Sequence, residues 1–597
     1  MTAGSRRRPA GADRVLLGGV ALIVLAAAIR TWTATQTWFY VDDFPLVATA
    51  ARDGLSLHDL FQPYIGHLMP AGRAAAWLTT AGGGYDYPVA VAELIALYVL
   101  VGAGALRLFR TLFGSRPVVL LLLAYLLLSP WLISPTAWWA AGINHLPALA
   151  ATAWALDAVI RHLRDPQRRH LVASVLWIVF GLAFAELALL AYVPVLVVAL
   201  GYFARGSLPQ RVGHLWTSYR SLVVVHAVLG AAYLAAYVAT SWDPTGDRPP
   251  APWRDYLVNL IGTVLPSAFI GGPGTWKQEW AAQFDVAPAV WMRLLGLAVV
   301  VGLVALSAMT RERALRAWLI PLSQVAATVV LMSQTRSIFG GSFILDLRFT
   351  TPLALGTALA LGLAFLPVEG ALESSAPRST HWLVDRPAPA VLALAVFAGL
   401  AVWSATTFPL LHVPQDQSAK RFFATFERSL DQHDAPVEMV DAPMPGFVFS
   451  GVEGRYATSL SMYDEVEVPA VVQDDYYVLD DTGALVRPAL DVARRAPAVT
   501  GGTGCDGHLV GSTGAGIALD GPVFGATWRL RVTYSATAET PAVITLGDRE
   551  VPVTLLAGEH TLETSGAGQY DAVRIDGLDD GVSACVSSLE VGTTRVP

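Results

Sequence analysis

The stretch that decides the fold class is VLLGGVALIVLAAA, residues 15–28, and its apolar character continues through Trp32. Apolar runs of about 18 or more residues have the length needed to cross a bilayer as a helix. Arg6, Arg7 and Arg8 precede this run as in a signal peptide, but no small-x-small cleavage site with a polar exit follows it. The sequence therefore predicts a retained first span, with cleavage as the alternative.

The composition extends this interpretation to most of the chain. Of 597 residues, 54% are hydrophobic and only 15% are charged, whereas soluble proteins have about 25% charged residues. The mean hydropathy is +0.49. The net charge is -7 and basic residues occur only in short loop groups, which argues against a nucleic-acid partner. The chain is thus predicted to be a polytopic α-helical membrane protein, with membrane lipids as its surroundings.

About eleven spans are predicted from the apolar runs. They lie near residues 14–33, 88–110, 117–135, 146–162, 170–186, 188–204, 219–240, 289–309, 315–333, 349–366 and 388–406.

Orientation follows from arginines, because cytoplasmic loops carry an excess of Lys and Arg. One set of alternate loops holds the arginine groups, at residues 6–14, 161–169, 205–220 and 311–316. Residues 1–13 are therefore predicted to be cytoplasmic, and the odd number of spans places the C-terminus outside the cell membrane.

The membrane domain, residues 14–406, has two long outer loops, at 34–87 and 241–288. Both mix aromatic with charged residues, and residues 56–60 and 256–265 resemble short helices lying in the membrane interface. Loops of this size usually serve a site rather than a simple connection.

Beyond residue 406 the character of the sequence changes. Residues 407–500 are predicted to be a mixed α/β segment with a helix at 419–430, and residues 501–597 a β-sandwich, because short alternating runs such as WRLRVTY at 528–534 are separated by turn signals. Both cysteines of the chain, Cys505 and Cys585, lie in this tail. Export would allow them to form a disulfide; two buried thiols are the alternative.

The first outer loop opens with two adjacent acids, Asp42 and Asp43, after the aromatic belt at residues 38–40. A carboxylate in a partly desolvated cleft can act as general base toward an acceptor hydroxyl. Its neighbour would tune that pKa or cap a helix over residues 45–52; alternatively, both acids only cap it. His67 and Arg73 in the same loop are candidates for binding a phosphate or orienting an acceptor, with a solvated histidine as the alternative.

Glu186 stands within the apolar segment FAELALL, residues 184–190. A carboxylate in a membrane is costly and normally faces a polar cavity or a partner. We expect Glu186 at the outer turn between two spans, near the acids of the first loop.

Two further polar groups are predicted at outer span ends. One contains Trp138, Trp139 and His145, and the other contains Arg348, preceded by Arg336. An arginine there can clamp a phosphate, or it can extend to lipid headgroups. The sequence contains no P-loop, no HExxH and no cysteine metal cluster.

Together these motifs resemble the GT-C glycosyltransferase superfamily, which includes the protein O-mannosyltransferases and the aminoarabinose transferases. The segment at 184–190 resembles the family's F-S-K-E-x-A-L motif, with alanine in place of the lysine. SPTAWW at 134–139 resembles its proline–tryptophan region, and LRFTTP at 347–352 its R-Y-x-x-P segment. The tail is similar to the carbohydrate-binding β-sandwiches of some arabinosyl and mannosyl transferases.

The resemblance implies an inverting transfer of sugar from a polyprenyl phosphate to a cell-envelope glycan, lipid or protein on the outer face. Asp42 or Asp43 would be the base, and Arg348, with Arg336 or Arg73, would stabilise the lipid phosphate that leaves. A divalent metal, Mg²⁺ or Mn²⁺, is left open, because some family members use one although no dedicated ligand set stands out. The implied substrate-binding residues are His67, Arg73, Trp138, Trp139, His145, Glu186, Arg336 and Arg348.

Two other classes of protein remain as alternatives. A glycolipid transporter or flippase would explain the spans and Glu186, although no internal repeat is evident. A non-catalytic membrane anchor presenting a glycan-binding tail would leave the first-loop acids dispensable.

Overall fold

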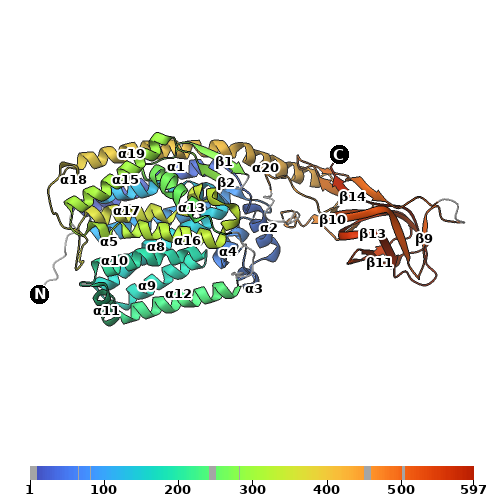
Figure 1. The fold of residues 1–597 in the computed structure, drawn as a ribbon, viewed down its shortest axis with the longest axis horizontal. Helices are drawn as coiled ribbons and strands as arrows, with labels where there is room; N and C mark the ends of the chain where they lie inside the picture. Colours follow the sequence, from blue (N-terminus) through green and yellow to red (C-terminus); the bar gives the residue numbers. More distant parts are fainter. Residues whose placement is uncertain are drawn as a thin grey trace. The chain divides into compact units, whose positions relative to one another are not determined.

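The computed structural model describes residues 10–64, 66–80, 82–240, 250–280, 283–448, 459–499 and 504–596. The chain divides into two compact units, Met1–Gln417 and Ser418–Pro597 (Figure 1). The first unit is helical and the second is mostly β.

Eight helices among the described residues of the first unit are long and apolar enough to cross a membrane, which makes it a multi-pass membrane domain. They are Arg14–Thr35 of α1 (Ala10–Thr35), α5 (Tyr87–Phe113), α8 (Trp139–Arg164), α12 (Arg220–Thr240), α15 (Val290–Thr310), Ala314–Thr335 with α16 (Leu319–Thr335), Leu347–Phe365 with α17 (Pro352–Phe365), and Pro387–Leu411 with α19 (Pro387–Thr407).

The predicted count of eleven spans is not confirmed, because the other three apolar segments are broken or short. Helix α6 (Val118–Leu128) and the segment Pro130–Ala137 form a pair bent by 48°, which gives a ninth span if counted as one. Helix α9 (Arg168–Leu182) has 15 residues, or about 22 Å at roughly 1.5 Å per residue. The last apolar segment, Glu186–Tyr202, joins the 3₁₀ helix η2 (Glu186–Ala191) to α10 (Tyr192–Tyr202).

Proline chemistry explains the break after α6. Ser129 precedes Pro130 and takes an extended conformation, as expected because proline disfavours the helical region for the residue before it. The last carbonyls of α6 then lack helical partners. Arg30 of α1, only 2% exposed, supplies donors: its Nη2 lies 2.8 Å from the Ser129 carbonyl and 3.4 Å from that of Leu127.

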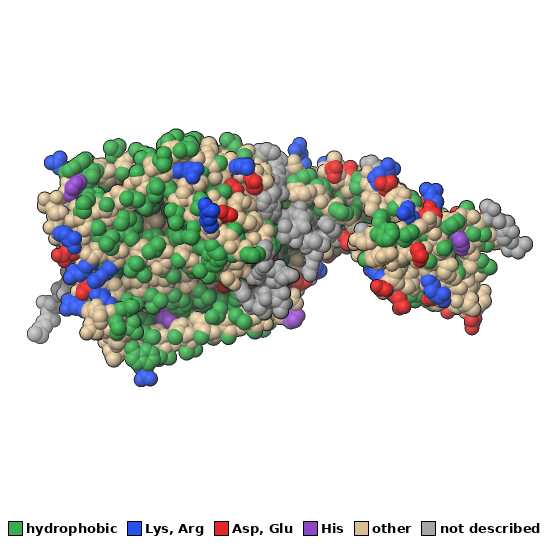
Figure 2. All heavy atoms as spheres, viewed as in Figure 1, with side chains coloured by type: hydrophobic (Ala, Val, Ile, Leu, Met, Phe, Trp, Pro, Cys, Tyr) green, Lys and Arg blue, Asp and Glu red, His purple; other side chains and the backbone are tan. Residues whose placement is uncertain are grey.

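The membrane helices differ in how much they face outward. Helices α8 and Leu347–Phe365 are largely buried, whereas α12 and α15 have apolar side chains mostly on the surface. Figure 2 shows such side chains covering much of the visible face of this unit. This is the pattern expected of helices whose outer faces meet lipid.

The two long loops contain their own short elements. The first holds α2 (Asp43–Asp53), α3 (Leu57–Leu60) and α4 (Pro70–Leu78). The second holds α13 (Trp253–Asn259), the π-helical turn η3 (Leu260–Val264), α14 (Leu265–Phe269) and the hairpin of β1 (Trp276–Trp280) and β2 (Gln283–Val286). Both predicted short helices, at 56–60 and 256–265, thus coincide with helical structure.

The second unit begins within α20 (Pro409–Leu430) and contains two sheets. A four-stranded sheet has the order β4 (Val466–Glu467), β3 (Val437–Met439), β6 (Tyr476–Leu479) and β7 (Leu485–Val486).

The larger sheet has eight antiparallel strands. They are β5 (Val471–Gln473), β8 (Ala489–Arg495), β9 (His508–Val510), β10 (Ala515–Ala536), β11 (Thr540–Leu546), β12 (Arg549–Leu555), β13 (Gly558–Asp576) and β14 (Ala584–Arg595).

The C-terminal region is mostly β, as predicted, and hydrogen bonds connect all eight strands of its larger sheet. Strands β10 and β13 pair along most of their length, with irregularities between Ala518 and Ala526 that can bend a sheet. One apolar core collects residues from β9 to β14. The predicted disulfide between Cys505 and Cys585 is present, with Cα atoms 5.6 Å apart.

Candidate active site

The chain between α1 and α2 is fixed by aromatic packing. Tyr40 is buried, and its ring lies 5.0 Å from that of Trp138. Phe39 is also buried, 5.2 Å from the ring of Tyr87. The aromatic belt predicted at residues 38–40 is therefore part of the interior, because these rings find partners at the start of α5 and α8.

Val41 joins this aromatic segment to the two acids, and its φ is +42°. A β-branched side chain rarely takes a positive φ, and such strain persists only where surrounding contacts impose it. Here the buried aromatic rings on one side and α2 on the other hold the turn. Strained backbone therefore lies directly before Asp42.

The two adjacent acids have different surroundings. Asp43 is completely buried, and its oxygens accept hydrogen bonds from the backbone N–H groups of Tyr40 and Ala140, both at 2.8 Å. It therefore ties the turn to the start of α8 rather than capping a helix over residues 45–52. Asp42 is half-buried, and its charge acts on Arg336.

The second part of the site joins the first loop to the break before η2. The Nδ1 atom of His67 lies 2.9 and 3.1 Å from the two carboxylate oxygens of Glu186. The loop is held there by the Ala71 N–H, which donates to the Ala183 carbonyl at 2.8 Å. Glu186 thus lies at a turn between helices and meets the first loop, as predicted.

A tight turn carries His67 and also contacts the backbone of Asp42. The backbones of Tyr64 and His67 exchange two hydrogen bonds of 2.9 Å, and Gly66 between them has φ +78°, a conformation that glycine adopts without strain. The hydroxyl of Tyr64 donates to the Asp42 carbonyl at 3.4 Å. One turn therefore carries His67 and contacts the Asp42 backbone.

Arg348 lies in an aromatic enclosure. Its guanidinium carbon is 4.2 Å from the ring centre of Trp138, 4.8 Å from that of Phe349 and 5.6 Å from that of Phe343. Its Nε is 3.3 Å from a carboxylate oxygen of the buried Asp346. A planar cation held by rings and one carboxylate is oriented before any ligand arrives.

Arg336 links these parts electrostatically. Burial lowers the pKa of Arg336 and so does the neighbouring Arg348, while Asp42 and Glu186 act in the opposite direction. His145 of α8 is 9% exposed and lies in the field of Arg348, His67 and Glu186. Six of the predicted site residues thus form one charged cluster: Asp42, His67, His145, Glu186, Arg336 and Arg348.

Two predicted residues are engaged elsewhere. Arg73 is 3% exposed and forms an ion pair of 2.8 Å with Asp53, between α4 and the end of α2. Trp139 is fully buried, and its Nε1 donates to Glu93 at 2.8 Å. Trp138, in contrast, contacts the cluster through Arg348.

Asp285 is a further candidate residue of the site, and the sequence analysis did not single it out. It lies on β2, is 4% exposed, and pairs through its backbone with Asp346. Burial, and secondarily the charge of Asp346, raise the pKa of Asp285 to about 7, against a hydrogen bond from Gln283 that lowers it. Its only sequence signal is an acid between apolar residues in a long loop.

The resemblance left a divalent metal open. Within the described part of the chain, no group of three or more His, Cys, Asp or Glu side chains is arranged to hold a metal ion. No step below is assigned to a metal.

Comparison with solved structures gives remote similarities. ArnT from Cupriavidus metallidurans, bound to undecaprenyl phosphate, is 13% identical over 75% of this chain and 85% of that chain, with a TM-score of 0.42. The arabinofuranosyltransferase AftD from Mycobacteria is 12% identical over 96% of this chain, TM-score 0.39, and the arabinosyltransferase EmbB from Mycobacterium smegmatis is 12% identical over 100%, TM-score 0.28.

These neighbours are glycosyltransferases of the GT-C type, the superfamily that the sequence motifs resemble. The chain spans 60% of the AftD chain and 66% of the EmbB chain. No protein-family model matches the sequence, and the curated proteins give no match. Because the structural likeness is remote, the residue roles below are argued from the geometry of this chain.

Proposed function

We propose that this protein is a membrane glycosyltransferase that moves a sugar from a polyprenyl phosphate to a cell-envelope acceptor on the extracytoplasmic face. The observation that carries the proposal is that the half-buried carboxylate of Asp42 acts electrostatically on Arg336, which also lies in the field of Arg348. A base for a hydroxyl and cations for a phosphate are the two groups that such a transfer needs.

Asp42 is the better candidate for the base of the two acids. Both oxygens of Asp43 accept backbone hydrogen bonds, so removing that carboxylate from its place would leave buried N–H groups without partners. In the proposed step, Asp42 takes the proton of the acceptor hydroxyl. The acceptor oxygen then bonds to the anomeric carbon from the face opposite the phosphate, which inverts its configuration.

The two arginines act on the leaving group. As the bond between the anomeric carbon and the phosphate oxygen breaks, its electron pair passes to the polyprenyl phosphate. Arg348, already oriented by Trp138 and Asp346, and Arg336 stabilise the charge that develops there. The orientation of Arg348 before reaction makes such stabilisation effective.

Glu186 acts through His67. Its carboxylate engages Nδ1 of the ring, which leaves Nε2 as the ring nitrogen for donor or acceptor. Glu186 is therefore a positioning residue in this proposal, and His67 contacts substrate. His145 and Trp138 complete the lining behind Arg348.

The arginine distribution supports the proposed side of the membrane. Asp42 follows the end of α1, whereas the loops with arginine groups adjoin the other end of the membrane helices. The positive-inside rule assigns that arginine-rich end to the cytoplasm. The acid cluster then faces outward, where a polyprenyl-phosphate sugar would meet a cell-envelope acceptor.

The proposal is tested with the full-length protein in proteoliposomes. A panel of polyprenyl-phosphate sugars is supplied with a cell-envelope extract, with the corresponding sugar nucleotides as control donors. We expect transfer from at least one lipid donor, none from the sugar nucleotides, and an inverted anomeric configuration by NMR. Folded protein that transfers from no lipid donor would overturn the function, and retention of configuration would overturn the single displacement.

One observation favours a second candidate, a glycolipid transporter. Two apolar segments of the described chain are broken, at Ser129 and before Glu186, and transporters place substrates at broken helices. A transporter would move labelled glycolipid between leaflets of proteoliposomes without releasing polyprenyl phosphate. The same preparations therefore separate the two functions.

A further inference from the structure

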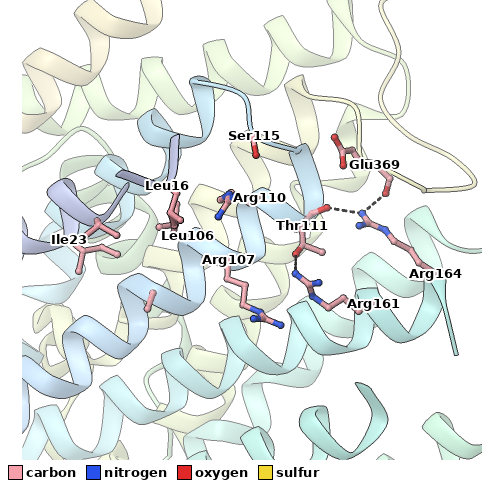
Figure 3. A pocket seen from close by; sticks show the side chains of 12 residues that line it. Leu16, Ile23, Leu106, Arg107, Arg110, Thr111, Ser115, Arg161, Arg164 and Glu369 are labelled. Carbon is pink, nitrogen blue, oxygen red and sulfur yellow. Dashed lines mark hydrogen bonds between the residues drawn. The ribbon is translucent and has the colours of Figure 1, made fainter. Parts of the chain in front are cut away.

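A second polar site lies at the other end of the membrane unit. A cavity of about 660 Å³ opens between α1, α5 and α8 (Figure 3). Leu16 in its wall stands near the start of α1 and Asp42 follows the end of that helix, roughly 30 Å away at about 1.5 Å per residue. The cavity is therefore separate from the cluster around Asp42.

One wall of the cavity is built from arginines. Arg107 and Arg161 each place Nε within 2.8 Å of an Asp157 carboxylate oxygen. Thr111 receives hydrogen bonds from Arg161, at its hydroxyl, and from Arg164, at its carbonyl. Figure 3 shows Arg161 and Arg164 joined to Thr111, with Arg164 also joined to Glu369.

Arg110 differs from the other three. Its side chain is half-buried in the same wall, and its Nε, like that of Arg164, is shielded from solvent with no hydrogen-bond partner. Unlike Arg164, whose Nη2 donates to Thr111, Arg110 forms no side-chain hydrogen bond with the described residues. No ion pair joins it to another residue in the described part of the chain. A buried donor without a partner is costly, and a ligand with acceptor oxygens would remove that cost.

The charges around the cavity do not balance. Four guanidinium groups, those of Arg107, Arg110, Arg161 and Arg164, face two carboxylates, those of Asp157 and Glu369. Two positive charges are left over. Guanidinium groups in such numbers favour the oxygens of a phosphate, which they bind with paired hydrogen bonds.

The opposite wall is apolar and belongs to membrane-spanning helices. Leu16 and Val20 of α1 are exposed there, at 37% and 48%, and Leu106 of α5 lies behind them. A small soluble anion would gain nothing from these side chains, whereas the acyl chain of a lipid would cover their apolar surface and remove it from water. The juxtaposition therefore fits an amphiphile.

We propose that this cavity binds the phosphate headgroup of an anionic membrane lipid, with the start of its acyl chains along α1 and α5. The arginine-rich end of the helices assigns the site to the cytoplasmic leaflet. The site does not depend on the proposed transfer reaction, because no residue is shared with the cluster around Asp42.

The test uses full-length protein stripped of lipid in detergent. Native mass spectrometry measures the binding of phosphatidylglycerol, of phosphatidylcholine with the same chains, and of inorganic phosphate. The variant is Arg110→Gln, and the matched control is Arg116→Gln, an exposed arginine near the same helix end that does not line the cavity. Thermal unfolding checks that both variants fold. If Arg110→Gln does not fold, Arg110→Lys is used in its place.

We expect wild type to bind phosphatidylglycerol at least tenfold more tightly than phosphatidylcholine. Arg110→Gln should lose that preference, Arg110→Lys should keep part of it, and Arg116→Gln should match wild type. Equal binding of both lipids by wild type would overturn the proposal. Tight binding of inorganic phosphate with no preference between lipids would instead identify a site for a soluble anion, and unchanged selectivity in Arg110→Gln would exclude this cavity.

Discussion

The two ends of the membrane unit both gather arginines, but they pair them differently. At one end, Arg336 lies in the electrostatic field of Asp42, Glu186 and Arg348, and aromatic rings fix Arg348. At the other end, Arg107 and Arg161 share Asp157, and Arg110 forms no ion pair with any residue that the structure describes. In a transfer reaction, a carboxylate can take the proton of the acceptor hydroxyl while an oriented cation stabilises the leaving phosphate. A surplus of cations beside an apolar wall offers no such base and can only bind an anionic ligand.

Three variants test this comparison further, and the largest effect among them is expected at Arg348. Its replacement by glutamine should lower the turnover of sugar transfer about 10²–10³-fold, as removal of one charge-stabilising donor does in other enzymes. Arg348→Lys should not recover the rate, because an ammonium cannot stack between Trp138 and Phe349 as a planar guanidinium does. The measurement is initial rate against donor concentration.

Full activity in Arg348→Lys would mean that only the charge matters, and that the aromatic enclosure does not orient it. Wild-type turnover in Arg348→Gln would remove this arginine from the reaction.

A smaller effect is expected at Glu186. Hydrogen bonds to charged groups are worth about 1.5–3 kcal/mol, so Glu186→Gln should lower turnover by at least about tenfold through the misplacement of His67. Because the two side chains act as one unit, Glu186→Gln should add little to a His67→Gln variant. Kinetics of the single and double variants measure this coupling, and fully additive losses would show that the two side chains act separately.

The smallest effect concerns stability and Asp285. Its folded pKa is raised to about 7, above the value of an exposed aspartate. The folded state therefore keeps this proton up to a higher pH than the unfolded state does. The stability that the neutral form contributes is lost as pH rises from about 4 to about 7. Asp285→Asn cannot lose that proton, so its melting temperature relative to wild type should rise over this range and level off above it.

That comparison is made in nanodiscs by intrinsic fluorescence. If the melting temperatures of wild type and Asp285→Asn changed in parallel from pH 4 to pH 8, Asp285 would not be held neutral by its surroundings.

The sequence was informative where a local pattern of residue types is enough to predict a feature. Apolar runs predicted the position of the helices, and an acid in an apolar segment singled out Glu186. The number of continuous spans was less predictable, because the break at Ser129–Pro130 interrupts a segment that is apolar throughout. A hydropathy pattern does not register such breaks in the backbone.

Roles set by distant residues could not be read from the sequence. Asp42 and Asp43 are equivalent as neighbours in the chain, and they differ because the N–H of Ala140 binds only Asp43. Asp285 has no motif, and its pKa shift results from burial beside Asp346, 61 positions later. Tertiary contacts, rather than local pattern, separate the candidate base from the structural acid.

The most direct test of the central claim is made on Asp42 itself. Wild type and Asp42→Asn, in the same proteoliposomes at saturating donor, are compared for both products, the glycosylated acceptor and the released polyprenyl phosphate. Loss of a general base costs about 10²–10⁴-fold, so wild type should form the two products in equal amounts and Asp42→Asn should form almost none while remaining folded. Transfer by Asp42→Asn at the wild-type rate would contradict the account.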